Sequence, residues 1–187
     1  MTLLLIGLAL FFGAHLVPST PLRAVLIGAL GEKGYKGLFT LASIGGLVIA
    51  VIGYRQVPVE YLFAPKPWAY PAALHTMPIV FILLASASSP THIRQWVRHP
   101  MALGVLLWSL LHYFANGEKA AVWFFGSFAI YAAFSIVSSS LRGQTLVKPG
   151  QVVAWKHDVI AVVAGLVLYG VVLVAHGWLF NRVLVSL

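Results

Sequence analysis

No cysteine occurs among the 187 residues of this chain, and acidic residues are almost as scarce. The missing cysteine excludes disulfide bonds, thiolate metal ligands, iron–sulfur clusters held by thiolates and a cysteine nucleophile. Only four acidic residues are present, each in an expected loop or at an expected helix end: Glu32, Glu60, Glu118 and Asp158. This shortage argues against carboxylate-driven proton coupling and against a metal site built from several carboxylates.

Charged residues of either sign make up only 9% of the chain, whereas hydrophobic residues make up 60%. A soluble domain averages about 25% charged residues, so this chain belongs to another class. Helices that span a bilayer need apolar runs of about 17–25 residues. Six such runs predict an all-α integral membrane bundle with about six transmembrane helices, at residues 2–17, 37–54, 71–88, 100–116, 120–138 and 158–180.

The sequence shows no sign of processing or of a second domain. The run over 2–17 has no basic residue before its apolar core and no clear small-x-small cleavage site after it, so we expect a retained helix. The longest polar stretches, 89–99 and 139–157, are too short for a separate catalytic domain. We therefore expect a single transmembrane domain over residues 1–187.

The net charge of +8 has a topological explanation in such a protein, because Lys and Arg collect in cytoplasmic loops. With six spans, eight basic residues fall on one side and four on the other. This bias predicts that both termini are outside the cytoplasm, and it requires no nucleic-acid partner. The richer side carries Arg23, Lys33, Lys36, Arg94, Arg98, Arg142, Lys148 and Lys156, and the other side carries Arg55, Lys66, Lys119 and Arg182.

Seven histidines outnumber the acidic residues, and several lie inside expected spans. An ionisable residue within a span is a functional candidate by default, because leaving it in lipid is expensive. The alternative is a hydrogen bond across helices or a reach toward headgroups, which we favour for His92, His157 and His176. The remaining candidates within spans are His15, His75 and His112.

His112 lies on a helical face with other side chains that are unusual against lipid. At 100° per residue, that face also carries Met101, Val105, Trp108 and Asn116. This composition is typical of a helix face that lines a site, not of a face that contacts lipid. His99 precedes His112 by roughly 20 Å along the helix axis, so His99 and His112 cannot ligate one metal ion.

His15 follows an apolar aromatic segment that contains Phe11 and Phe12. Several aromatic-rich helices, each with a single histidine, suit a flat apolar macrocycle such as haem, for which neutral imidazole is a common axial ligand. Zinc would need three or four convergent ligands, and no known zinc spacing occurs here.

Three segments taken in order resemble the NnrU family of bacterial membrane proteins and the related 15-cis-zeta-carotene isomerases. They are "FFGAHLVPSTPLR" (11–23), "LGEKGYKGLFTL" (30–41) and "RHPMALGVLLWSLLHYFANG" (98–117). The resemblance runs from about residue 3 to residue 143. The last apolar run is generic.

The resemblance implies a haem b protein of the bacterial inner membrane. By their positions in the motifs, His15 and His112 are the implied axial ligands. NnrU proteins are associated with nitric oxide and nitrite reduction in denitrification, whereas the isomerases use haem to move a cis double bond of a polyene. The isomerases carry a cysteine where this chain has Ser109, so a mechanism that uses that thiolate cannot operate here.

The implied ligand pair conflicts with the expected depths of the two residues. His15 lies near one end of its span, and the depths of His15 and His112 would differ by roughly 12 Å at 1.5 Å per residue. His75 is therefore kept as an alternative partner of His112. Trp108 and Asn116 are expected to line the haem, and its propionates are expected to bind three residues near the helix ends, Arg23, Arg98 and His99.

The "RHP" segment at residues 98–100 has a second interpretation. Membrane methyltransferases that modify isoprenylcysteine or phospholipids carry a similar Arg-His-Pro-x-x-x-Gly segment near their S-adenosylmethionine site. Those enzymes also use a downstream pair of acidic residues, and after residue 118 this chain has only Asp158. In the structural alternative, Pro100 begins a helix, where its missing N–H costs nothing.

Overall fold

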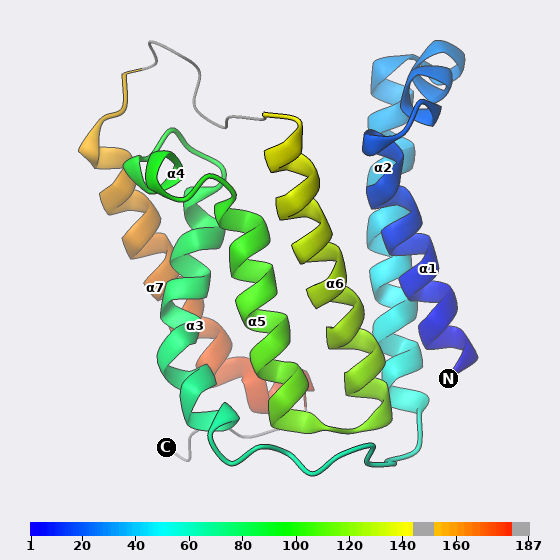
Figure 1. The fold of residues 1–187 in the computed structure, drawn as a ribbon, viewed down its shortest axis with the longest axis vertical. Helices are drawn as coiled ribbons and strands as arrows, with labels where there is room; N and C mark the ends of the chain where they lie inside the picture. The colour runs from blue at the N-terminus through cyan, green and yellow to red at the C-terminus, as the bar shows by residue number, and fades with distance from the viewer. Residues whose placement is uncertain (144–151, 181–187) are drawn as a thin grey trace. The chain divides into compact units, whose positions relative to one another are not determined.

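A computed structural model describes residues 1–143 and 152–180, the last three by their backbone alone (Figure 1). Lys148 and Arg182, which were counted in the charge bias, lie outside the described residues. All the regular elements that are described are helices: α1 (Thr2–Leu16), the 3₁₀ turn η1 (Val17–Ser19), α2 (Leu22–Gln56), α3 (Ala69–Ser86), α4 (His92–Trp96), α5 (Pro100–Asn116), α6 (Lys119–Leu141) and α7 (Trp155–Phe180).

Five of these helices are long and apolar enough to cross a membrane, which confirms the predicted all-α membrane protein. They are α1 continued through η1, α2, α3, α6 and α7. The remaining expected span is α5, which begins and ends at the predicted residues. It has 17 residues, the lower limit for a spanning helix, and reaches about 25 Å at 1.5 Å per residue.

The start of α2 differs most from expectation. The helix was expected over 37–54, but it begins at Leu22 and is interrupted at Gly31, whose φ of 69° and ψ of 167° are not helical. The polar residues after this break remain helical because they are exposed, and Glu32 pairs with Lys36 one turn later at 2.9 Å. The segment 22–30 is therefore a short apolar helix of its own, joined to the long span through Gly31.

Residues 1–64 and 116–127 form one compact unit, and its main feature is the close packing of α1 on α2. Leu4 and Ala50 are completely buried in this contact. A Cβ on Gly46 would stand 2.6 Å from the backbone N of Phe11, and a Cβ on Gly7 or Gly53 would collide with backbone atoms of the facing helix. The two backbones thus touch through small residues, as in many membrane helix pairs.

Hydrogen bonds join the segment after α2 to the start of α6 within the same unit. The Leu62 N–H donates to the Gly117 carbonyl at 2.9 Å, and the Lys119 N–H donates to the Glu60 carbonyl at 2.7 Å. The side chains of Lys119 and Glu60 also form an ion pair at 2.8 Å. Gly117 has a φ of 66°, and a Cβ there would collide with the Phe63 carbonyl, so glycine is required at this turn.

Residues 65–115 and 128–187 form the second unit, of which the structure describes 65–115, 128–143 and 152–180. In it α3 packs on α7, where a Cβ on Gly165 would lie 2.7 Å from the Ile82 Cα. The Tyr169 hydroxyl donates to the Leu74 carbonyl at 3.1 Å in the same contact. The helix α6 contributes residues to both units, and the single domain expected over 1–187 stays a prediction.

Candidate functional site

The three candidate histidines within the expected spans share one local arrangement. In each, the ring Nδ1 lies within hydrogen-bond distance of the carbonyl four residues earlier: Phe11 for His15 at 2.8 Å, Pro71 for His75 at 2.7 Å and Trp108 for His112 at 2.8 Å. A carbonyl only accepts, so Nδ1 carries the proton. In the neutral form of each ring the lone pair is then on Nε2, with Nδ1–H held by a backbone carbonyl, as in typical metal-ligating histidines.

The His15 ring lies half-buried in an aromatic cluster at the end of α1. It stacks on Phe11 with centroids 4.1 Å apart and planes at 26°. Phe39 of α2 contacts the same ring at 5.1 Å, and Phe12 contacts Phe11 edge-on at 5.1 Å. The aromatic wall expected beside His15 is therefore present, and α2 extends it.

His112 lies half-buried near the end of α5, beside its expected neighbour Trp108. The two ring centroids are 5.4 Å apart, and Phe128 of α6 contacts the Trp108 ring edge-on at 5.5 Å. Met101, at the other end of the expected face, is 55% exposed. The expected face is thus half-buried from Val105 to Asn116, where α5 ends, and exposed only at Met101.

The candidate ligands belong to different parts of the chain. His15 lies in the first unit, whereas His75 and His112 lie in the second, where His75 is exposed on α3. No cluster of three or more His, Asp or Glu side chains that could hold a metal ion occurs in the described residues. A site with one or two axial imidazoles does not need such a cluster, and the choice between His15 and His75 as the partner of His112 stays a prediction.

The basic residues expected near propionates have separate surroundings. Arg98 is exposed just before α5, and the neighbouring His99 contacts the Ser140 hydroxyl through Nε2 at 3.0 Å. Pro100 is buried as the first residue of α5, as the structural interpretation of "RHP" predicted. Arg23 is exposed in the first unit, with its guanidinium carbon 6.0 Å from the centre of the Tyr35 ring.

Ser109, which stands where the isomerases have cysteine, is completely buried. Its hydroxyl donates to the Leu106 carbonyl of the same helix at 3.0 Å. Gly104, at the glycine position of the "RHP" motif, lies against the Leu84 side chain, which a Cβ would approach at 3.3 Å. Both residues thus make contacts that stabilise the fold.

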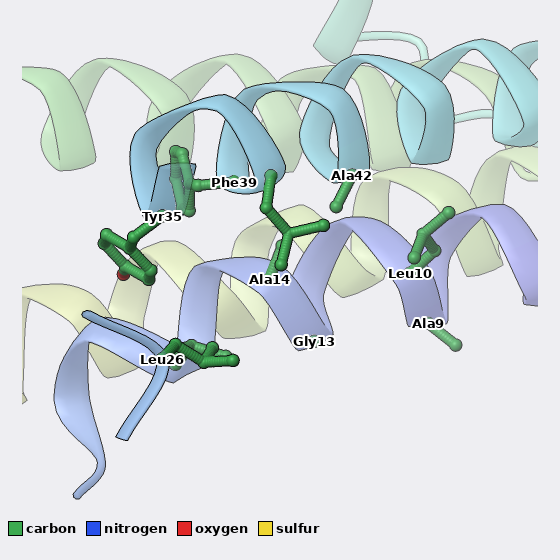
Figure 2. A pocket seen from close by; sticks show the side chains of 10 residues that line it. Ala9, Leu10, Gly13, Ala14, Leu26, Tyr35, Phe39 and Ala42 are labelled. Carbon is green, nitrogen blue, oxygen red and sulfur yellow. The ribbon is translucent and has the colours of Figure 1, made fainter. Parts of the chain in front are cut away.

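Sequence reasoning missed a hollow in the first unit, between α1 and both parts of α2 (Figure 2). One part has a volume of about 260 Å³ and is lined by small and apolar side chains, including Gly13, Ala14 and Ala42. An adjoining part of about 390 Å³ is lined by Arg23 and Lys36 together with Pro18 and Thr40. Tyr35 and Phe39 line both, and no described histidine lines either.

A second missed cluster joins α4 to the start of α7 in the second unit. Asp158 is 6% exposed and accepts from the His92 Nδ1–H at 2.8 Å and from the Ile93 N–H at 3.2 Å. The His92 ring stacks on Trp155 at 4.0 Å. This network holds the short helix α4 in place, in agreement with the structural role expected for His92.

A bundle of apolar spanning helices with imidazoles inside the spans defines a multi-pass membrane protein. Comparison with family models assigns the particular family. The model described as NnrU protein matches residues 3–183, nearly the whole chain, and the chain belongs to the NnrU family. No curated protein and no solved structure matches it.

Proposed function

We propose that this protein binds haem b through histidines within its helices and serves nitric oxide or nitrite metabolism at the bacterial inner membrane. The observation that carries the proposal is the arrangement shared by the three histidines, whose Nδ1–H groups donate to carbonyls of their own helices. This arrangement puts the ligating lone pair on Nε2 and restricts the ring orientation before any ligand arrives.

The residues around His15 and His112 fit such a group. His15 would hold the iron beside Phe11 and Phe39, whose rings offer an apolar surface to the porphyrin face. His112 would hold it beside Trp108, which also supplies the carbonyl that fixes the ring. The bound iron would supply one-electron chemistry and affinity for nitric oxide.

The assignment of His15 and His112 as the axial pair rests on the family resemblance, with His75 as the alternative. The polyene isomerase is the less favoured function, because Ser109 hydrogen-bonds to its own helix where the isomerase has a thiol. The methyltransferase is disfavoured because Asp158, the last acidic residue of the chain, is already held by His92 and the Ile93 N–H.

The visible absorption spectrum of the detergent-purified protein tests this proposal. We expect a Soret band with sharp low-spin bands on reduction, and a shift when nitric oxide is added. Replacement of an axial ligand by alanine should abolish the low-spin bands. The series His15→Ala, His75→Ala and His112→Ala identifies the pair, because the histidine that is not a ligand leaves the spectrum unchanged.

His157→Ala is the matched control, because its Nδ1 contacts the carbonyl of the distant Pro90 rather than one of its own helix, and no haem role is expected for it. A featureless spectrum after haem is supplied during expression would refute the proposal. So would an unchanged spectrum in all three variants. A haem spectrum that does not respond to nitric oxide would retain the cofactor and exclude the nitric oxide role.

A further inference from the structure

The Tyr35 hydroxyl is a buried polar group that the fold of the first unit leaves unsatisfied. Tyr35 is 8% exposed, and its hydroxyl has no hydrogen-bond partner within the described part of the chain. Buried hydroxyl groups almost always have a partner, because desolvation without one is costly. Tyr35 lines both parts of the hollow between α1 and α2, so a molecule in that hollow can supply the missing partner.

The first part of the hollow has the chemistry of a site for a hydrocarbon chain. It is elongated, with Tyr35 and Leu26 at one end and Ala9 and Leu10 at the other (Figure 2). Leu10 and Leu38, which also line it, are 41% and 45% exposed, as lipid-facing side chains are. An acyl chain can therefore enter from the bilayer.

The second part of the hollow has the chemistry of a headgroup site. Arg23 and Lys36 line it, and the Arg23 guanidinium lies over the Tyr35 ring. Lys36 also pairs with Glu32 at 2.9 Å, so one carboxylate accompanies the two cations and leaves one net positive charge. Both partners of that pair are more than half exposed, which leaves Lys36 able to reach an anion as well.

We propose that this hollow binds one anionic membrane phospholipid. One acyl chain lies between α1 and α2, and the phosphate is bound by Arg23 and Lys36 and accepts a hydrogen bond from the Tyr35 hydroxyl. Charge complementarity favours this occupant, since guanidinium and ammonium groups bind phosphate and the inner leaflet is rich in anionic lipid. No described histidine lines the hollow, so the proposed axial ligands are not part of this site, although Phe39 lines it and also contacts His15.

Native mass spectrometry of the full chain in detergent tests this site. The protein is titrated with a phosphatidylglycerol and a phosphatidylcholine that have the same acyl chains. We expect tighter binding of the phosphatidylglycerol. Tyr35→Phe, which removes only the hydroxyl, should weaken it about fivefold, and Arg23→Gln about tenfold.

The apolar part is tested by filling it. A Cβ on Gly13 would have nothing within 4 Å, so Gly13→Leu can project its side chain into the hollow without backbone collision. This variant should lose the phosphatidylglycerol. Gly45→Leu is the matched control, because a Cβ there also has nothing within 4 Å and Gly45 does not line the hollow.

Equal affinity for the two lipids would overturn the proposal, as would unchanged binding in Tyr35→Phe and Arg23→Gln. Displacement of the lipid by an equal concentration of inorganic phosphate would show a simple anion site and refute the acyl-chain part. The visible spectra of Tyr35→Phe and Gly13→Leu report separately on haem, because neither residue is expected to bind it. Lipid binding can therefore fail while haem binding succeeds, and the reverse.

Discussion

At the scale of single residues, the hydrogen bond made by Nδ1 distinguishes the three candidate histidines from His92 and His157. His15, His75 and His112 donate to a carbonyl of their own helix. His92 and His157 instead use Nδ1 to contact groups distant in sequence, Asp158 and the Pro90 carbonyl. The first arrangement presents Nε2 to a ligand, and the second fixes one segment of the chain to another.

The buried Asp158 carboxylate gives a stability prediction at this scale. Asp158→Ala would leave the His92 and Ile93 donors without their acceptor, so we expect a loss of about 2–3 kcal/mol in the free energy of unfolding. Asp158→Asn keeps one acceptor oxygen and should cost less. Denaturant titration of the purified protein in mild detergent measures both values.

Glu32→Ala provides the control, because Glu32 also belongs to an ion pair but is 65% exposed. Its removal should lower the free energy of unfolding far less than Asp158→Ala, because exposed pairs one helical turn apart contribute little. If Asp158→Ala costs no more than Glu32→Ala, the network between α4 and α7 does not stabilise the fold.

At the scale of helices, the sequence predicts the helix bounds that follow from the length of an apolar run. It does not predict a helix start that depends on a break within the helix. The bounds of α5 were predicted to the residue, because Pro100 and the polar "NGEK" segment mark its ends. The start of α2 was placed at residue 37 instead of Leu22, because "GEKGYKG" is as polar as a loop. Leu26, which precedes the break at Gly31, lines the same hollow as Tyr35. The burial of Tyr35 thus depends on the break, and no residue pattern predicts it.

The pairing of α1 with α2 depends on glycines at the points where the two backbones meet. Gly7→Ala would place a methyl group against the Ala50 backbone, which cannot give way as a side chain can. We expect a loss of about 1–3 kcal/mol, typical of overpacking. The midpoint of unfolding by sodium dodecyl sulfate measures it.

Gly13→Ala on the same helix is the matched control. A Cβ on Gly13 has nothing within 4 Å, and alanine is the better helix former by up to about 1 kcal/mol. This variant should be as stable as the wild type or more so. Equal losses in Gly7→Ala and Gly13→Ala would mean that the close contact at Gly7 contributes nothing of its own, because helix propensity alone would make both variants more stable.

At the scale of the whole molecule, the short helix α5 decides the topology. With six crossings, the basic residues divide eight against four, a clear positive-inside bias. If α5 does not cross, Lys119 and Arg182 join the richer side, and Arg142, Lys148 and Lys156 leave it. The division then becomes seven against five, and the C-terminus moves to the cytoplasm. The charge distribution therefore favours six crossings, although α5 has only 17 residues.

The absence of cysteine allows this topology to be tested with single introduced thiols. Arg98 and Lys119 flank α5. The exposed Lys66 is the reference for the outer side, because it precedes α5 and keeps its side in both topologies, whereas the exposed Arg142 changes side if α5 does not cross. In intact cells, a membrane-impermeant maleimide should label Lys66→Cys and Lys119→Cys. It should label Arg98→Cys and Arg142→Cys only after the inner membrane is opened.

Labelling of both Arg98→Cys and Lys119→Cys from one side would show that α5 enters and leaves by the same face. His112 would then lie on a re-entrant helix, and its depth relative to His15 would have to be counted again from that face.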